Sequence, residues 1–118
     1  MSSDNRGIRD ELLRLREQAA AHVAALDSDL RELFEASRSS NADDEHDPEG
    51  ATIAFERAQL AAVRDAASRH LADLDAAVRR LDAGTYGVCE RCSQPIPAER
   101  LAARPTALRC VRCAARSV

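Results

Sequence analysis

The four cysteines of this chain form two C-x-x-C pairs, Cys89 with Cys92 and Cys110 with Cys113, and seventeen residues separate the pairs. Two residues between ligands form a tight turn that can direct both sulfur atoms toward one tetrahedral ion. A disulfide framework would need an oxidising compartment, and a thioredoxin-like motif would need a single C-x-x-C beside a βαβ pattern. Neither condition is met, so the spacing predicts one structural Zn²⁺ ion held by all four cysteines.

A zinc ion bound by four protein sulfurs has no open position for a substrate or an activated water. The sequence also lacks a serine or cysteine nucleophile with a plausible base, and it lacks a Gly-rich phosphate loop. We therefore expect the metal to stabilise the fold, and we expect the protein not to be an enzyme.

Two long stretches carry apolar residues at spacings of three and four, which is typical of amphipathic helices. The second stretch ends at Gly84, a residue suited to the left-handed conformation that terminates helices. Neither helix can bury its stripe alone, so we predict a mainly α fold: a long antiparallel helical hairpin (coiled coil) with a small C-terminal four-cysteine zinc-finger module. The stripes are Ile8, Leu12, Leu15, Ala19, Val23, Leu26, Leu30 and Leu33, and Ile53, Leu60, Val63, Ala67, Leu71, Leu74, Val78 and Leu81.

The two stripes also predict a register and a domain division. We assign residues 1–83 to the hairpin and residues 84–118 to the zinc module, and we expect His22 and His70 at the edge of the hairpin seam. Folding the chain back near residue 45 places apolar residues opposite one another throughout. The predicted pairs are Ile8 with Leu81, Leu12 with Val78, Leu15 with Leu74, Leu26 with Val63, and Leu30 with Leu60.

The predicted bend, residues 39–50, is the most acidic segment, with five carboxylates and no basic residue. Such a bend can simply be a solvated turn whose carboxylates favour the start of the next helix. Alternatively, the hairpin is an arm that brings these carboxylates to a metal ion or a basic surface of a partner. Composition does not separate the two interpretations. The candidate tip residues are Asp43, Asp44, Asp47 and Glu49, and we expect His46 to be solvated.

The net charge of -3 is distributed unevenly. Residues 1–88 carry eleven Arg against eighteen Asp and Glu, whereas residues 89–118 carry six Arg against two Glu. Zinc with four thiolates adds about -2 to the second segment, which halves its positive balance of +4. Aromatic residues that could stack on bases are also missing there, so sequence-specific DNA binding is not expected.

The chain of 118 residues contains no apolar run long enough to cross a membrane and no secretory signal pattern at its first residues. We therefore expect a cytoplasmic, monomeric protein without a membrane partner.

Four further short motifs accompany the cysteines. They are Gly84-Thr85-Tyr86-Gly87, Ile96-Pro97, Arg100-Leu101 and Arg104-Pro105-Thr106. With the two C-x-x-C pairs, they resemble the C-terminal signature of the DksA/TraR family of bacterial zinc-finger proteins. The helix, turn and helix that precede the motifs follow the same order as in that family.

The resemblance implies a transcription regulator that binds RNA polymerase and inserts an acidic-tipped coiled coil into its secondary channel to modulate initiation. Family members often act with the alarmone ppGpp. The resemblance therefore implies ppGpp as a candidate further ligand of the complex. The best-studied members carry D-x-x-D-x-A at the tip. Here Asp44 and Asp47 keep the D-x-x-D spacing, but Pro48-Glu49 follows, and an alternative register aligns Asp47-Pro48-Glu49 with the tip.

In this interpretation the zinc module docks on the rim of the polymerase. The candidate docking residues are Arg79, Arg80, Arg91, Arg104 and Arg109. Two other functions fit the same sequence features: direct DNA binding by the arginine-rich C-terminal segment, and a stress-related interaction protein of the same fold without polymerase activity.

Overall fold

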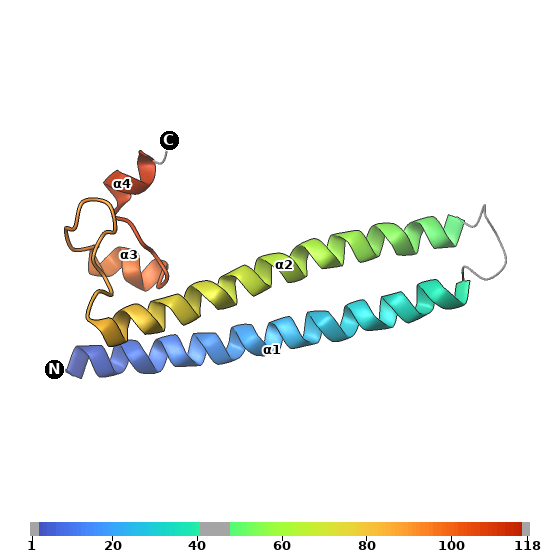
Figure 1. Ribbon diagram of the computed structural model, residues 1–118, viewed down its shortest axis with the longest axis horizontal. Helices are drawn as coiled ribbons and strands as arrows, with labels where there is room; N and C mark the ends of the chain where they lie inside the picture. Colours follow the sequence, from blue (N-terminus) through green and yellow to red (C-terminus); the bar gives the residue numbers. More distant parts are fainter. Residues whose placement is uncertain (1–2, 41–47, 117–118) are drawn as a thin grey trace. The chain divides into compact units, whose positions relative to one another are not determined.

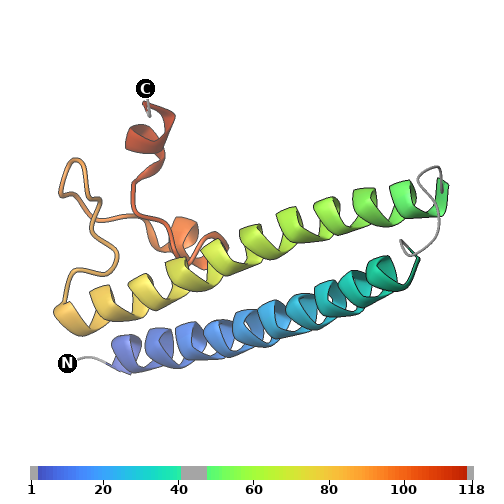
Figure 2. The same ribbon diagram turned by 45° about the vertical axis from the view of Figure 1, so that its right-hand side comes forward.

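The computed structural model describes residues 3–40 and 48–116, and in this part of the chain it contains four helices (Figure 1). Two are long, α1 over Ser3–Ser40 and α2 over Pro48–Ala83, and two are short, α3 over Ala98–Ala103 and α4 over Val111–Ala115. Helices α1 and α2 form the antiparallel hairpin, as both views show (Figures 1 and 2). The mainly α fold with a C-terminal four-cysteine module is therefore confirmed. Neither long helix is apolar enough to cross a membrane.

The chain divides into two compact units. The basal unit comprises Met1–Arg16 and Ala72–Val118, and the distal unit comprises Glu17–Leu71. The zinc module thus clusters with the ends of both long helices, whereas the sequence division followed the end of α2, which lies at Ala83.

Ion pairs between α1 and α2 in the basal unit define the helix register. Arg9 pairs with Asp82, and Arg16 pairs with Asp75 at 3.4 Å. Each of these four residues directly follows a member of a predicted apolar pair. The ion pairs therefore agree with the predicted register of Ile8 with Leu81 and of Leu15 with Leu74.

The two units differ in which described residues are buried. The basal unit contains large, fully enclosed side chains, among them Leu12 and Leu74 at 1% exposure each. In the described part of the distal unit fewer residues are buried, and Leu26 is the only large apolar side chain among them. The buried basal residues are Leu12, Leu74, Ala77, Val78, Leu81, Cys89, Ile96 and Cys113, and the buried distal residues are Ala19, Leu26 and Ser37.

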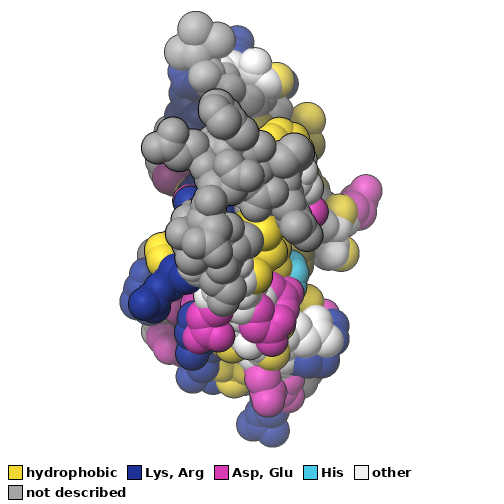
Figure 3. Space-filling view, turned by 90° about the vertical axis from the view of Figure 1, so that its right-hand side faces the viewer, with side chains coloured by type: hydrophobic (Ala, Val, Ile, Leu, Met, Phe, Trp, Pro, Cys, Tyr) yellow, Lys and Arg dark blue, Asp and Glu magenta, His cyan; other side chains and the backbone are white. Residues whose placement is uncertain are grey.

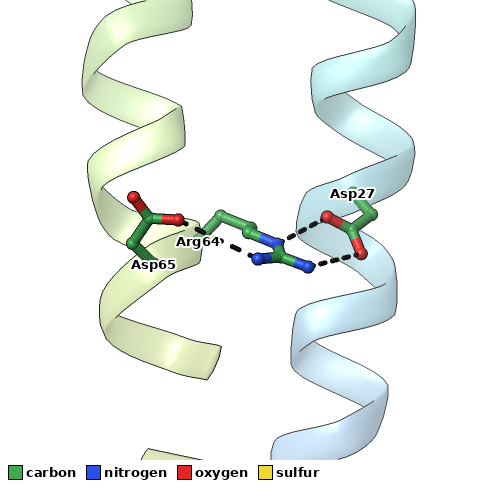
Figure 4. Close-up of polar contacts among 3 residues, drawn as sticks. All are labelled: Asp27, Arg64 and Asp65. Atoms are coloured by element: carbon green, nitrogen blue, oxygen red, sulfur yellow. Dashed lines mark hydrogen bonds and ion pairs between the residues drawn. The ribbon is translucent and has the colours of Figure 1, made fainter. Parts of the chain in front are cut away.

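In the distal unit a charged residue takes a place that the sequence assigned to an apolar one. Val63 is 49% exposed, so its predicted place in the seam is wrong. The next residue, Arg64, instead faces α1 and donates hydrogen bonds of 2.7 and 3.4 Å to Asp27, while its other nitrogen lies 3.9 Å from Asp65 (Figure 4). The long aliphatic stem of arginine can pack along a seam while its guanidinium group reaches a carboxylate.

The hydrogen bond from Arg64 holds the pKa of Asp27 below its ordinary value. A carboxyl group with a lowered pKa stabilises the fold above its unfolded-state pKa, and this contribution disappears as the pH falls through the folded-state pKa. We predict that Arg64→Gln raises the pKa of Asp27 and weakens the acid dependence of stability below about pH 4. Carboxyl NMR titration of Asp27 checks this. Arg69→Gln, at an exposed arginine of the same unit, is the control that should leave the titration unchanged.

Candidate metal centre

A Schellman motif at the end of α2 starts the zinc module. The Thr85 amide donates to the Arg80 carbonyl at 2.8 Å, and the Gly84 amide donates to the Leu81 carbonyl at 3.2 Å. Gly84 has φ 81°, a left-handed conformation that glycine adopts without a steric penalty. The predicted helix end is thus confirmed, and it reverses the chain toward the first cysteine pair.

The first cysteine pair lies on a tight turn. The Cys89 amide donates to the Gln94 carbonyl at 2.8 Å, and the Ser93 amide donates to the Cys89 carbonyl at 2.9 Å. Ser93 closes the turn with φ 63°, a conformation unusual for a residue other than glycine. Sequence reasoning missed Ser93, because serine gives no signal for a left-handed backbone.

The second pair is positioned by a short helix. Cys110 precedes α4 and Cys113 lies within it, and the Ala114 amide donates to the Cys110 carbonyl at 2.9 Å. The Glu90 amide donates to the Leu108 carbonyl at 2.8 Å, which joins the two cysteine-bearing loops. Pairs separated by seventeen residues in the sequence therefore meet in one module.

The four sulfur atoms have the spacing of a tetrahedral zinc site. The Sγ atoms of Cys89, Cys92, Cys110 and Cys113 all lie within 4.8 Å of one another, and those of Cys92 and Cys110 are 3.9 Å apart. A zinc ion about 2.3 Å from each sulfur places neighbouring sulfurs about 3.8 Å apart in a tetrahedron. Both the donor set and the geometry fit one structural Zn²⁺ ion.

Backbone hydrogen bonds lower the pKa of the first cysteine of each pair. The Cys92 backbone amide, assisted by others, lowers the pKa of the Cys89 thiol to about 6, and the Cys113 backbone amide lowers the pKa of Cys110. Burial raises the pKa of the Cys113 thiol to about 12. Since zinc binds thiolates, its binding is coupled to the loss of thiol protons.

Apolar side chains enclose one side of the site. Cys89, Cys113 and Ile96 are buried together, and Leu101 packs against them, whereas Cys92 is exposed. Ile96 therefore covers this side of the cysteine site with apolar surface. A Cβ atom on Gly87 would lie 3.3 Å from the Leu101 side chain at a φ of 81°, so glycine is needed beside this cluster.

The predicted tip residues mostly lie outside the part that the structure describes. This holds for Asp43, Asp44, Asp47 and His46, whereas Glu49 belongs to the first turn of α2. The other two histidines, His22 and His70, are exposed on the long helices. The acidic tip accordingly stays a prediction.

The five candidate docking arginines differ in their surroundings. Arg109 forms an ion pair with Glu90 at 2.9 Å, and Arg91 donates to the Arg116 carbonyl at 2.8 Å. Within the described residues, the enclosed Nη2 atom of Arg80 has no hydrogen-bond partner. Arg79 and Arg104 are exposed, and among the described residues no side-chain hydrogen bond engages either of them. These last two guanidinium groups are the most available for a partner.

Sequence reasoning also missed an open groove of about 600 Å³ in the basal unit. The first turns of α1 line one side, and α3 with Tyr86 lines the other, so residues about ninety positions apart in the chain meet there. The Tyr86 hydroxyl is already engaged, because it donates to the Pro105 carbonyl at 2.7 Å. The lining residues are Gly7, Ile8, Glu11, Leu12, Tyr86, Ala98, Leu101, Ala102 and Pro105.

A helical hairpin that leads into a closed four-cysteine site defines a zinc-finger protein with a structural metal. The chain belongs to the DksA/TraR family: its residues 84–118 match the family model "prokaryotic dksA/traR C4-type zinc finger". The structure is similar to that of transcription factor DksA2 from Pseudomonas aeruginosa, with a TM-score of 0.81 and 30% identity, over 98% of this chain and 83% of that chain.

Two curated relatives match over shorter segments. An uncharacterized protein of Aquifex aeolicus is 46% identical over 44 residues, which is 37% of this chain and 30% of that protein. The RNA polymerase-binding transcription factor DksA of Caulobacter vibrioides is 42% identical over 52 residues, which is 44% of this chain and 37% of that protein. The matches thus span less than half the length of either relative.

Proposed function

We propose that this protein is a transcription regulator that binds RNA polymerase and inserts the acidic end of its hairpin into the secondary channel. The observation that carries the proposal is the match to DksA2, which extends over 98% of this chain and so includes both the hairpin and the zinc module. The Caulobacter relative is named for RNA polymerase binding, which supports the same partner.

The composition of the two parts supports a division of roles. The zinc site offers four sulfur ligands and no open coordination position, so it shapes the module without chemistry of its own. The carboxylates of residues 39–50 are the groups that can act on a polymerase active centre, where catalytic metal ions attract acidic oxygens. We assign docking to the surface of the basal unit, with Arg79 and Arg104 as the favoured contacts, and ppGpp is a candidate further ligand of the complex.

We predict that replacing Asp43, Asp44 and Asp47 with Asn together abolishes the effect on transcription while polymerase binding is retained, because the amides keep the shape of the side chains but lose their charge. The measurement is transcription from a stable-RNA promoter by purified polymerase, with the parent protein and the variant at matched occupancy. An unchanged effect of the triple variant would contradict the tip mechanism.

The control carries the same change in net charge away from the bend. Asp10, Asp29 and Asp73 are exposed on the long helices, and their replacement with Asn should leave regulation intact. A pull-down of polymerase by the parent protein tests the proposal itself. Direct DNA binding would instead give a DNA affinity that falls steeply with salt, because binding to phosphates releases counterions.

A further inference from the structure

The zinc module is rich in arginine. Residues 89–118 carry six Arg against two Glu, whereas the face of the molecule at the hairpin end displays acidic and basic side chains together (Figure 3). Each cysteine pair has an arginine directly before its second cysteine, Arg91 in the first pair and Arg112 in the second. A zinc ion with four thiolates carries a charge of about -2, so nearby cations are favoured by charge alone. The arginines nevertheless differ in what they contact.

Apolar side chains cover the zinc site on one side. Cys89, Cys113 and Ile96 are buried together, whereas Cys92 is exposed. Because the shell around a metal site controls the access of solvent, the exposed ligand is the point at which water and competing ligands reach the ion first. The contacts that hold the turn of Cys92 in place therefore matter most for retention of the ion.

Glu90, which lies in this turn, is bound to the segment that leads to the second cysteine pair. Its amide donates to the Leu108 carbonyl at 2.8 Å, and its carboxylate accepts a hydrogen bond of 2.9 Å from Nε of Arg109. Arg109 directly precedes Cys110. One backbone hydrogen bond and one ion pair thus join the first cysteine pair to the residues before the second.

Arg100 extends this connection to α3. The residue is half-buried, and its Nε donates to the Arg109 carbonyl at 2.7 Å. A hydrogen bond from a charged donor is stronger than one between neutral groups, so this contact fixes the backbone directly before Cys110. Arg100, Arg109 and Glu90 therefore form a continuous chain of contacts from α3 to the first cysteine pair.

Arg91 makes a further link from the turn of Cys92. Its Nη1 donates to the Arg116 carbonyl at 2.8 Å, and Arg116 is the C-cap residue of α4, the helix that contains Cys113. Arg112 has the corresponding position in the second pair, but it is exposed, and among the described residues its side chain has no hydrogen bond or ion pair. The two arginines thus share sequence position and charge, and they differ in their contacts.

We propose that four residues that do not bind the metal position the two cysteine pairs and thereby set how tightly zinc is held: Glu90, Arg91, Arg100 and Arg109. Their contacts keep the two cysteine-bearing loops together, so the four sulfurs already lie within 4.8 Å of one another. Such contacts beyond the ligands themselves commonly determine metal affinity, because they orient the ligands. The inference concerns the metal site, and it does not depend on binding to polymerase.

The first test compares Arg91→Gln with Arg112→Gln in the full chain loaded with zinc. Both variants lose one positive charge at the same position of a cysteine pair, but only Arg91→Gln loses a link to α4. Competition with EDTA measures the dissociation constant for zinc. Arg91→Gln should bind zinc about fivefold more weakly, as expected for one hydrogen bond, and Arg112→Gln should stay within about twofold of the parent.

The second test covers the chain of contacts from α3. Arg100→Gln should weaken zinc binding about tenfold, because the carbonyl before Cys110 loses a part-buried charged donor. Glu90→Arg and Arg109→Glu should each weaken binding, and the double charge reversal should restore most of it. With Co²⁺ in place of zinc, every variant should keep the absorption spectrum of four-sulfur coordination, since all four ligands remain.

Several results would overturn the inference. Equal losses of affinity in Arg91→Gln and Arg112→Gln would mean that positive charge near the thiolates, and not a contact, retains the ion. Parent-like affinity in Arg91→Gln and Arg100→Gln would show that these contacts do not position the ligands. A Co²⁺ spectrum with fewer than four sulfurs would assign the weaker binding to a disrupted module. A double charge reversal that restores no affinity would exclude a positioning role for the ion pair of Glu90 with Arg109.

Discussion

Replacing Cys113 with Ser will release zinc and unfold the zinc module, while the distal unit keeps its helices. Cys113 is 8% exposed and packs with Cys89 and Ile96, so its loss removes both a ligand and part of the module's small core. In so small a module, metal binding and folding are coupled, and three remaining sulfurs leave the ion exposed to water. Zinc content by atomic absorption should fall from one ion per chain toward none, and circular dichroism should retain most of the helical signal.

The control for this experiment is a serine substitution at a neighbouring residue that is not a metal ligand. Val111 lies between the two cysteines of the second pair and is 61% exposed, so Val111→Ser should retain one zinc ion. Loss of any of Cys89, Cys92 or Cys110 should resemble loss of Cys113. Full zinc retention by a Cys92→Ser variant would show that the ion does not need all four sulfurs, which would contradict a four-cysteine site.

The cysteine spacing was sufficient to predict the metal site because the C-x-x-C geometry is local. Each turn is built within a few residues, and the first cysteine of each pair accepts a backbone hydrogen bond from the second. Gly84 was predictable for the same reason, since its left-handed backbone is a property of one residue. Local rules also gave the register, because the apolar spacing fixes which helix faces meet.

Residue spacing alone does not decide which of two neighbouring residues on α2 faces α1. Val63 and Arg64 both continue a pattern of threes and fours from Leu60 to Ala67, and hydrophobicity alone selects Val63. The structure selects Arg64, because Asp27 on the other helix offers a carboxylate at 2.7 Å. A contact of that kind joins residues 37 positions apart, and the sequence of one helix carries no sign of it.

The groove and the outward phenylalanines were missed for a related reason. The groove joins the first turns of α1 to α3, and its existence depends on how the module packs within the basal unit. Phe34 and Phe55 fall outside both predicted stripes, and in sequence an apolar residue off the stripe is unremarkable.

Truncation of Leu74 to Ala should destabilise the protein by about 2–5 kcal/mol, the largest effect we expect from a single apolar substitution. Leu74 is 1% exposed and lies in the unit that contains most of the large buried side chains. Removing its branched end leaves a cavity that the surrounding side chains cannot fill without moving. Urea denaturation followed by circular dichroism measures the loss.

Two matched leucine substitutions decide whether stability is concentrated in the basal unit. Leu108→Ala, at a 40% exposed side chain, should cost less than about 1 kcal/mol, because little apolar surface is returned to water. Leu60→Ala, at a half-buried seam position of the distal unit, should fall between the two. If Leu60→Ala destabilises the protein as much as Leu74→Ala, packing in the distal unit contributes as much to stability as packing in the basal unit. The polar residues of the distal unit then do not weaken its packing. If the order holds, the distal unit is the part of the hairpin whose own packing contributes least to the free energy of unfolding.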